Sequence, residues 1–414
     1  DESPLNRPAF TAPRTDFEQT LAKAWQKVLN REKVGIHDNI FELGGDSILI
    51  LQILAELNQQ GIQLRTSHFF EFQTIAGLSE ANVAAGNNTA EQSLVTGKVL
   101  LSPIQHWFFE QELQEPHYYN QSITLSTKDK LDHQSLSQSF QYLVELHDAL
   151  RLRFDNTNGQ WHQYNPDSVK HEIFSIQRLT AEDGKLPQDE IRQATLEMQA
   201  SLDIEAGTLI KARLFCVDDP TPDQLLIVVH HLVVDGVSWR ILLEDLHNFY
   251  GQLASKKPLQ MPSKTSSWKA WTENLKDAAS TAKIMQDTEY WLRIAKTKTA
   301  QLPVDFAGTQ NTEASSEWVT SALSTEDSEQ LLERASKVWH TSINEVLLAA
   351  FSTAIFADNN ELPVLFDVEG HGREDLFGDA DVSRTVGWFT SLYPLLLCGD
   401  NADSPLATIK KAKL

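Results

Sequence analysis

Residues 225–239 read LLIVVHHLVVDGVSW, and this stretch decides the fold class of most of the chain. Its first five residues are apolar, which is typical of a strand buried in a sheet. The strand leads into two adjacent histidines, His230 and His231, and the chain then turns at Asp235 and Gly236 before an amphipathic helix. The pattern therefore predicts a strand, a loop and a helix, with ionisable side chains at the end of a core strand.

Segments with the same two kinds of pattern alternate on both sides of this stretch, from Val99 onward, and predict an α/β domain. Apolar residues at helical spacing predict helices at Ser135–Asp148, Gln188–Ser201, Ser238–Leu253, Ser266–Leu275, Thr281–Lys296, Glu326–Trp339 and Ile343–Phe356. Apolar and β-branched runs predict strands at Ser122–Leu125, Ile210–Phe215, Leu225–His231, Val364–Val368 and Leu392–Leu397.

The first 80 residues carry the pattern of a small helical bundle instead. A capping box opens the first predicted helix, and a second helix follows the glycine turn before Ser47. Two shorter helical pieces are predicted around His68–Phe72 and from Thr74. Residues 81–97, which are rich in Ala, Asn, Thr and Gly, then predict a linker.

The formal net charge of −22 argues against a nucleic-acid-binding protein, because phosphates would be repelled. No apolar stretch approaches the roughly 20 residues that span a bilayer, so we expect no membrane partner. The sequence begins Asp-Glu-Ser-Pro without a basic and apolar leader, and Cys216 and Cys398 each lie in an apolar run. We therefore expect no secretion signal, buried free thiols and a cytoplasmic location.

The sequence Gly44-Gly45-Asp46-Ser47 places a serine at the start of a predicted helix, behind two residues without side chains. A hydroxyl in this position is exposed, and a bulky partner can approach the backbone. A serine that simply caps the helix after a glycine turn would explain the same four residues. On their own they favour the helix-capping serine.

The residues around Ser47 nevertheless resemble a peptidyl carrier protein at many positions. The matches are Thr15-x-x-Glu18, Trp25, Val28-Leu29, Val34-Gly35-Ile36, Asp38-Asn39-Ile40-Phe41, Glu42-Leu43, Gln52 and Thr74-Ile75-Ala76-Gly77-Leu78. In that family the serine that matches Ser47 carries a 4′-phosphopantetheine arm whose thiol holds the amino acid as a thioester. A separate phosphopantetheinyl transferase attaches the arm. Carriers that feed epimerization domains typically have aspartate before that serine, as Asp46 here.

The large part of the chain resembles the epimerization domains of nonribosomal peptide synthetases. The matching segments are Ser102–Phe108 (PIQxWF), His147–Arg151 (HDxLR), His230–Trp239 (HHxxxDGxSW), Thr341–Leu348, Val368–Glu374 and Val386–Thr390. Condensation domains share the histidine signature but usually lack the sequence EGHGRE, which stands here at residues 369–374. The resemblance covers nearly the whole chain, as a peptidyl carrier–epimerization didomain.

This resemblance implies the fold and the domain division. The carrier, residues 1–80, should be an all-α four-helix bundle. The epimerization domain should be a two-lobed α/β pseudodimer of the chloramphenicol-acetyltransferase type, with residues 98–275 in the N-terminal lobe and 276–414 in the C-terminal lobe. The family usually continues past Leu414 through a glycine- and tyrosine-containing loop and a further strand, so we expect the second lobe to be incomplete.

Epimerization of an aminoacyl or peptidyl thioester removes the Cα proton and returns one to the opposite face. The thioester carbonyl acidifies that proton and negative charge develops on an enolate oxygen, so one base and one acid are needed on opposite sides of the carbon. The resemblance assigns this pair to His231 and Glu369, in opposite lobes, and leaves open which serves which face. A glutamate with an ordinary pKa of about 4.3 is a poor proton donor near neutrality, and raising that pKa to ~7 would cost about 3.7 kcal/mol.

The residues next to this pair are expected to support it. His230 points to the other face of the strand from His231 and is expected to be a packed core histidine. Asp235 is expected to hold the loop through a charge or a backbone hydrogen bond. Gly236 would let the loop backbone come close to the arm or to the enolate, and Ser238 fits the N-cap of the following helix.

Other nearby residues are open to a structural explanation. His371 and Arg373 are close to Glu369 in sequence and could either tune it or form structural pairs. Trp388 and Phe389 could line the site or fill the core, and the core is the expectation for both. No metal site is expected. The i, i+4 spacing of His231 and Asp235 would suit metal ligands on a helix, but these residues are predicted to lie in a loop, and no third ligand has a recognisable spacing.

Two other functions remain open on the sequence alone. A condensation domain would use His231 to form a peptide bond between two carrier-bound substrates and would not need Glu369. A module that only docks carriers would not depend on His231. As an epimerization domain the chain implies an upstream adenylation domain, a downstream condensation domain, and docking of its own carrier on the large part.

Overall fold

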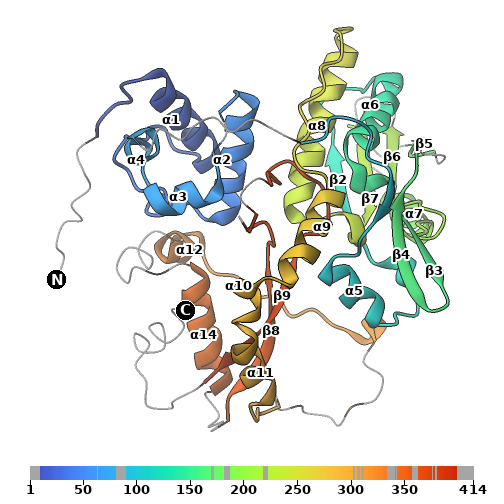
Figure 1. Cartoon of the computed structure of the whole chain (residues 1–414). Helices are drawn as coiled ribbons and strands as arrows, with labels where there is room; N and C mark the ends of the chain where they lie inside the picture. The colour runs from blue at the N-terminus through green and yellow to red at the C-terminus, as the bar shows by residue number, and fades with distance from the viewer. Residues whose placement is uncertain are drawn as a thin grey trace.

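The computed structural model describes residues 10–62, 64–80, 90–168, 172–180, 187–217, 222–301, 304, 308, 312–332, 341, 343–356, 362–374, 376–377 and 380–398. Figure 1 shows a helical body formed by the N-terminal residues, a sheet with helices packed on it, and a pair of strands formed by residues from the C-terminal part. His231 directly follows a strand of the sheet, and Glu369 lies in the C-terminal pair of strands.

The N-terminal body consists of the helices α1 (Asp16–Leu29), α2 (Ser47–Gln59), α3 (Thr66–Phe72) and α4 (Ile75–Glu80). Helix α1 begins where the Thr15 hydroxyl accepts a hydrogen bond from the backbone N–H of Glu18, at 3.1 Å. Trp25 and Phe69 are fully buried in a core to which all four helices contribute. The predicted four-helix bundle is therefore confirmed.

The central sheet of the large part has the strand order β2-β7-β6-β5. Its strands are β2 (Asn120–Ser126), β5 (Phe174–Leu179), β6 (Ile210–Val217) and β7 (Gln224–His230), and the pair β5–β6 is parallel while the other two pairs are antiparallel. Strand β7 is buried on both faces, because Leu225, Ile227 and Val229 join one core cluster and Leu226 and Val228 join another. This explains its continuous apolar run.

Helices cover both faces of this sheet (Figure 1). Helices α6 (His133–Leu146) and α8 (Gly236–Ala254) belong to the larger core cluster, and α7 (Gln188–Ala200) packs on the opposite face. A second, antiparallel sheet has the order β1-β4-β3, formed by β1 (Gly97–Val99), β3 (Arg153–Thr157) and β4 (Gln160–Asn165). The remaining elements here are α5 (Pro103–Glu110) and the 3-10 turns η1 (Pro116–Tyr118), η2 (Asp148–Arg151) and η3 (His231–Val233).

The C-terminal part contains one antiparallel strand pair, β8 (Val364–Gly370) with β9 (Ser391–Leu397). Helix α14 (Ile343–Ile355) packs on this pair through a small core that includes Ile355, Val364 and Leu395. The other elements in the described residues of this part are α9 (Trp268–Ala279), α10 (Ala282–Met285), α11 (Thr288–Lys296), η4 (Glu313–Ser315) and α12 (Thr325–Gln330).

Several elements differ from the sequence-based predictions. The predicted helix Thr281–Lys296 is two helices, α10 and α11, and the strand expected to reach His231 ends one residue earlier because His231 starts η3. Strands β1, β3, β4 and β5 were not predicted, since they are short and mix polar with apolar residues, as in QWHQYN at residues 160–165. Of the predicted helix Glu326–Trp339, residues 333–339 lie outside the described part.

The expected linker is held against the large part over the residues that the structure describes. The Gln92 side chain exchanges hydrogen bonds with the backbone of Lys264, at 2.9 and 3.0 Å, and Val95 is buried. Gly97, the last residue of the expected linker, is already paired in β1. We therefore propose that the linker is shorter than residues 81–97. Helix α9 is also continuous across the predicted lobe boundary between residues 275 and 276.

The N-terminal bundle contacts the large part at the C-terminal end of α2. The side-chain amide of Asn58 donates to Asp381 at 3.1 Å and to the Ser383 hydroxyl at 3.0 Å. These two residues belong to the segment between β8 and β9, which also packs into the core of the first lobe through Val382 and Val386. The N-terminal bundle therefore contacts a segment of the large part that also contributes buried residues to the core.

The two cysteines do not match the expected burial. Cys216 is half-buried on β6, and Cys398 is exposed just after β9, so the expectation of a buried thiol is wrong for Cys398. Position in an apolar run does not ensure burial at the end of a strand, where one side of the sheet is uncovered. Among the described residues, no helix is both long and apolar enough to cross a membrane.

Candidate active site

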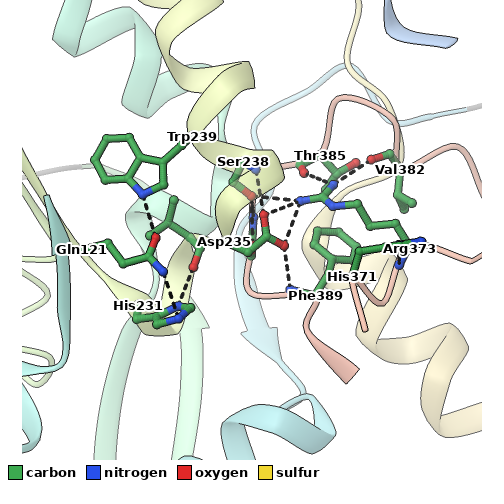
Figure 2. A network of polar contacts seen from close by, with 12 residues as sticks. Gln121, His231, Asp235, Ser238, Trp239, His371, Arg373, Val382, Thr385 and Phe389 are labelled. Atoms are coloured by element: carbon green, nitrogen blue, oxygen red, sulfur yellow. Dashed lines mark hydrogen bonds and ion pairs between the residues drawn. The ribbon is translucent and has the colours of Figure 1, made fainter. Parts of the chain in front are cut away.

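The turn that follows β7 is built around the carboxylate of Asp235. Its Oδ1 accepts from the backbone N–H of Ser238 at 2.7 Å, which makes Asp235 the N-cap of α8. Arg373 Nη2 lies 3.0 and 3.2 Å from its two oxygens, and the backbone N–H of Phe389 donates to Oδ2 at 3.1 Å (Figure 2). The predicted charge and backbone hydrogen bonds of Asp235 are both present, and they hold the turn in place.

Ser238 is not the N-cap that the sequence suggested. It is the third residue of α8, and its hydroxyl donates to the Gly387 carbonyl at 3.0 Å. The same oxygen accepts from the Gly387 N–H at 3.1 Å and from Arg373 Nη2 at 2.9 Å. Asp235 takes the cap because its carboxylate reaches back over the first turn, which frees the serine to bind a segment 149 residues away.

Arg373 is a structural residue of this network rather than a free cation. Its Nη1 donates to the carbonyls of Val382 and Thr385 at 3.0 and 2.7 Å, and its guanidinium lies 3.8 Å above the Phe389 ring. Its side chain is fully buried, and this burial lowers the pKa of Arg373 while the negative charge of Asp235 opposes the effect. Arg373 therefore ties the C-terminal part to the turn that carries the signature histidine.

His231 lies at the start of η3, and its ring contacts side chains from other elements as well as the backbone of its own turn. Its Nδ1 is 2.8 Å from the Val234 carbonyl oxygen, and its Nε2 is 3.0 Å from the amide nitrogen of Gln121 (Figure 2). The Tyr119 ring stacks on it with centroids 5.4 Å apart, and the Trp388 ring lies at 4.5 Å. The imidazole is thus fixed in position and is half-buried.

Trp388 and Phe389 are buried in the core of the first lobe, as predicted. Trp388 also fits the alternative that the sequence left open, because it packs against the ring of His231 as well as against Tyr119. The segment that carries these aromatic residues therefore forms one wall of the histidine site.

His230 points away from this site and is a core residue, as predicted. It is fully buried; its Nε2–H donates to the Pro116 carbonyl at 2.8 Å, and its Nδ1 accepts from the Leu232 N–H at 3.2 Å. Both ring nitrogens are satisfied when the ring is neutral. Burial lowers the pKa of His230 to about 4.

We expect His230 to make the folded state less stable as the pH falls. The pKa of His230 is about 6.5 in the unfolded chain and about 4 in the folded protein. The stability that is present above pH 6.5 is therefore lost progressively as the pH falls from 6.5 to about 4. The full loss is about 3 kcal/mol. The measurement is the free energy of unfolding in urea at several pH values, for the parent protein and for His230→Gln.

The variant should show a flatter dependence on pH, because glutamine does not titrate. Replacement of the exposed His106 by glutamine is the control and should leave the slope as it is. Equal slopes for the parent protein and His230→Gln would contradict the prediction.

Glu369 lies near the end of β8, opposite Leu392 of β9, and its side chain is exposed. Its charge acts on the site through Tyr119, whose pKa is raised first by burial and then by the negative charge of Glu369. Because the Tyr119 ring also stacks on His231, one phenol contacts His231 and is acted on by the charge of Glu369. Among the described residues, no hydrogen bond or ion pair joins His231 directly to Glu369.

The three other ionisable residues of the EGHGRE sequence, His371, Arg373 and Glu374, have partners of their own. His371 Nδ1 accepts from the backbone N–H of Arg373 at 3.0 Å, and its Nε2 lies 3.9 Å from Glu374. Structural pairing is therefore the explanation that the contacts favour for His371 and Arg373, over tuning of Glu369.

Gly236 is exposed at the first position of α8, and an added Cβ would meet no atom within 4 Å. No contact within the protein requires glycine at this position, and the expected approach of substrate remains a prediction. Among the described residues, no group of three or more His, Cys, Asp or Glu side chains is gathered to hold a metal ion.

Local contacts explain the residues of the glycine turn before α2. Asp46 is the N-cap, with Oδ1 accepting from the Leu49 N–H at 2.8 Å, so Ser47 is the first helical residue and not the cap. A Cβ on Gly45 would come within 2.7 Å of Ile40, which excludes a larger residue there. The start of this 13-residue helix suits a phosphate diester, because the first N–H groups and the helix dipole favour negative charge.

Comparison with known proteins identifies both parts of the chain. A family model described as a condensation domain matches residues 95–414, and one described as a phosphopantetheine attachment site matches residues 19–81. The chain belongs to the condensation-domain family. Its N-terminal bundle is the carrier that precedes this condensation-family domain, and such a carrier holds 4′-phosphopantetheine on a serine.

Curated relatives of the condensation-family chain are subunits of peptide synthases. It is 46% identical over 392 residues to one of the linear gramicidin synthase subunits of Brevibacillus parabrevis, covering 94% of this chain and 5% of that protein. It is 39% identical over 405 residues to surfactin synthase subunit 2 of Bacillus subtilis (strain 168), covering 98% and 11%. The chain thus spans a small part of these relatives.

Solved structures confirm the two-lobed fold. The epimerization domain from the third module of tyrocidine synthetase B is similar with a TM-score of 0.72 and 35% identity, covering 78% of this chain and 72% of that one. The first condensation domain of the calcium-dependent antibiotic synthetase is similar with a TM-score of 0.60 and 18% identity, covering 76% and 72%. At that identity the second likeness shows the fold alone.

Two residues at the histidine were missed by sequence reasoning. Tyr119, just before β2, and Gln121, its second residue, both contact the His231 ring. The predicted strand begins at Ser122, one residue too late to include Gln121. Their spacing of two residues, which places both on one face of an extended segment, was the available signal.

Proposed function

We propose that this condensation-family domain is an epimerase that converts the L-aminoacyl or peptidyl thioester on its carrier to the D-form. The observation that carries the proposal is the His231 ring stacked on Tyr119, a phenol whose pKa is raised first by burial and then by the negative charge of Glu369, so that both acid–base groups act on one ring. The EGHGRE sequence at residues 369–374 and the 35% identity to an epimerization domain support this function over peptide-bond formation.

In this proposal Ser47 is the residue that holds the 4′-phosphopantetheine arm. The thioester formed by the arm's thiol makes the Cα proton of the amino acid more acidic. His231 and Glu369 then exchange protons with the two faces of that carbon, one as base and one as acid. Tyr119 and Trp388 border the imidazole with aromatic surface and exclude water from it, while Asp235 and Arg373 keep the turn in position.

The proposed function implies partners outside this chain. A phosphopantetheinyl transferase would load the carrier, an adenylation domain would supply the amino acid, and a condensation domain would consume the D-product. We place these reactions in the cytoplasm. The hydrogen bonds of Asn58 to Asp381 and Ser383 support docking of this carrier on its own catalytic domain.

The test loads Ser47 with an L-aminoacyl-phosphopantetheine in deuterated water, then releases the amino acid and analyses it by chiral chromatography and mass spectrometry. We expect D-product that carries one deuterium at Cα. A fully loaded, folded protein that gives no exchange, but forms a peptide when a second loaded carrier is added, would identify a condensation domain instead.

A further inference from the structure

The His231 ring contacts a chain of hydrogen bonds that reaches it from two other elements. We propose that Gln121, oriented by Trp239, is a positioning residue that fixes neutral His231 in the tautomer whose proton is on Nδ1. The inference deepens the proposed function, on which it rests, because it assigns Nε2 as the nitrogen that exchanges a proton with the substrate.

The chain of hydrogen bonds begins at Trp239 on α8. Its indole Nε1 lies 2.7 Å from Oε1 of Gln121 on β2 (Figure 2). An indole N–H can only donate, so the group of the glutamine amide that faces it must be the oxygen. Trp239 is 7% exposed and therefore holds this amide from a fixed position in the core.

With its oxygen turned to Trp239, the amide presents its nitrogen to His231. The distance from Gln121 Nε2 to His231 Nε2 is 3.0 Å. An amide nitrogen also only donates, so His231 Nε2 must be the accepting nitrogen with a free lone pair. A proton on Nε2 would place two donors against each other.

The other side of the ring agrees with this assignment. His231 Nδ1 lies 2.8 Å from the carbonyl oxygen of Val234, which can only accept. The proton of the neutral ring therefore lies on Nδ1. Three hydrogen bonds, from Trp239 through Gln121 to His231 and on to Val234, are satisfied by one tautomer, and the alternative tautomer breaks two of them.

This arrangement has a direct consequence for proton transfer. Nε2 has one lone pair in the ring plane, so the Cα–H of the substrate must take the place of the Gln121 amide. When His231 is the base, the Cα–H bond breaks, the proton forms a bond to Nε2, and the electron pair moves toward the thioester oxygen. When the substrate leaves and the Gln121 amide returns to Nε2, two N–H donors face each other, which favours release of that proton.

The charged and titratable groups around His231 belong to three neighbours. Tyr119 stacks on the ring, and its pKa is raised first by burial and then by the charge of Glu369. His230 precedes His231 in the chain and is buried in its neutral form. In the part of the chain that the structure describes, Gln121 and Val234 are the groups in hydrogen-bond contact with the imidazole nitrogens. The tautomer is therefore set by these two groups rather than by a neighbouring charge.

The test is nitrogen-15 NMR of histidine-labelled protein whose carrier holds no amino acid, with His231→Ala used to assign the His231 signals. We expect the Nδ1–H tautomer at neutral pH in the parent protein. Gln121→Glu keeps the shape but replaces the donor by an acceptor, so His231 should move to a form with a proton on Nε2. The rate of Cα inversion should fall more than tenfold in the same variant.

Two further variants keep the result interpretable. Gln121→Met removes both hydrogen bonds at similar size, so the population of the Nδ1–H tautomer should fall to what the Val234 carbonyl alone sustains, and this variant serves if Gln121→Glu does not fold. Gln134→Glu makes the same chemical change at an exposed position of α6 and should leave tautomer and rate unchanged.

Two outcomes would overturn the proposal: an Nε2–H ring in the parent protein, or an unchanged tautomer in folded Gln121→Glu. The tautomer is measured without any reaction. The expected tautomer in a parent protein that does not invert its substrate would therefore reject the proposed function while supporting the role of Gln121.

Discussion

Replacement of His231 by alanine is expected to slow inversion of the carrier-bound amino acid by about 10²–10⁴-fold, the usual contribution of a general acid or base. The loss should depend on the enantiomer supplied. If His231 removes the proton from the L-form, the variant should take up no solvent deuterium from L-substrate. It should still exchange D-substrate without inverting it, because Glu369 remains to remove and return that proton.

Glu369→Gln should show the reciprocal pattern, with exchange retained for the enantiomer that the His231 variant fails to exchange. The measurement is deuterium uptake at Cα from each loaded enantiomer, resolved by chiral chromatography and mass. Glu374→Gln, an exposed carboxylate in the same sequence motif, is the matched control and should behave like the parent protein. Undiminished exchange from both enantiomers in His231→Ala would reject the two-residue assignment.

The second large effect concerns stability. Arg373→Met should reduce the free energy of unfolding of the large part by about 3–5 kcal/mol, because it leaves the buried carboxylate of Asp235 without its cation. The variant also removes the donors to the Val382 and Thr385 carbonyls and the contact with Phe389. Urea unfolding followed by tryptophan fluorescence measures the change.

Glu374→Gln is again the control, since its contact with His371 is long and exposed and should contribute less than about 1 kcal/mol. Arg373→Lys keeps the charge and loses the fork of donors, so it should fall between the parent protein and Arg373→Met. A loss below about 1 kcal/mol for Arg373→Met would show that the buried network does not hold the turn.

The sequence predicted most reliably what depends on local pattern. The apolar run before His230 marks β7 because both faces of that strand are buried, and the glycine turn before Ser47 marks the start of α2. The predicted pairing of Asp235 with a charge or backbone group was also correct, but its partner, Arg373, lies 138 residues away. No periodicity within one segment contains that information.

The same limit explains why Gln121 was missed. Its contact with His231 depends on the pairing of β2 with β7, in which Gln121 lies opposite Val229. A shift of one residue in that register would turn Gln121 to the other face of the sheet. Register is set by the whole sheet and its covering helices. The local sequence around a polar residue at the edge of a predicted strand therefore does not identify the residue that it contacts.

The segment between β8 and β9 contacts the carrier, the core of the first lobe and the histidine site. Within twenty residues it binds the carrier through Asp381, enters the first-lobe core at Val382 and closes the histidine site with Trp388. A carrier at Asn58 and a substrate at His231 thus act on one short piece of backbone. If docking of the carrier stabilises one conformation of this segment and that conformation binds substrate more tightly, bound substrate strengthens docking of the carrier by the same free energy. Carrier docking and substrate binding are thus thermodynamically linked.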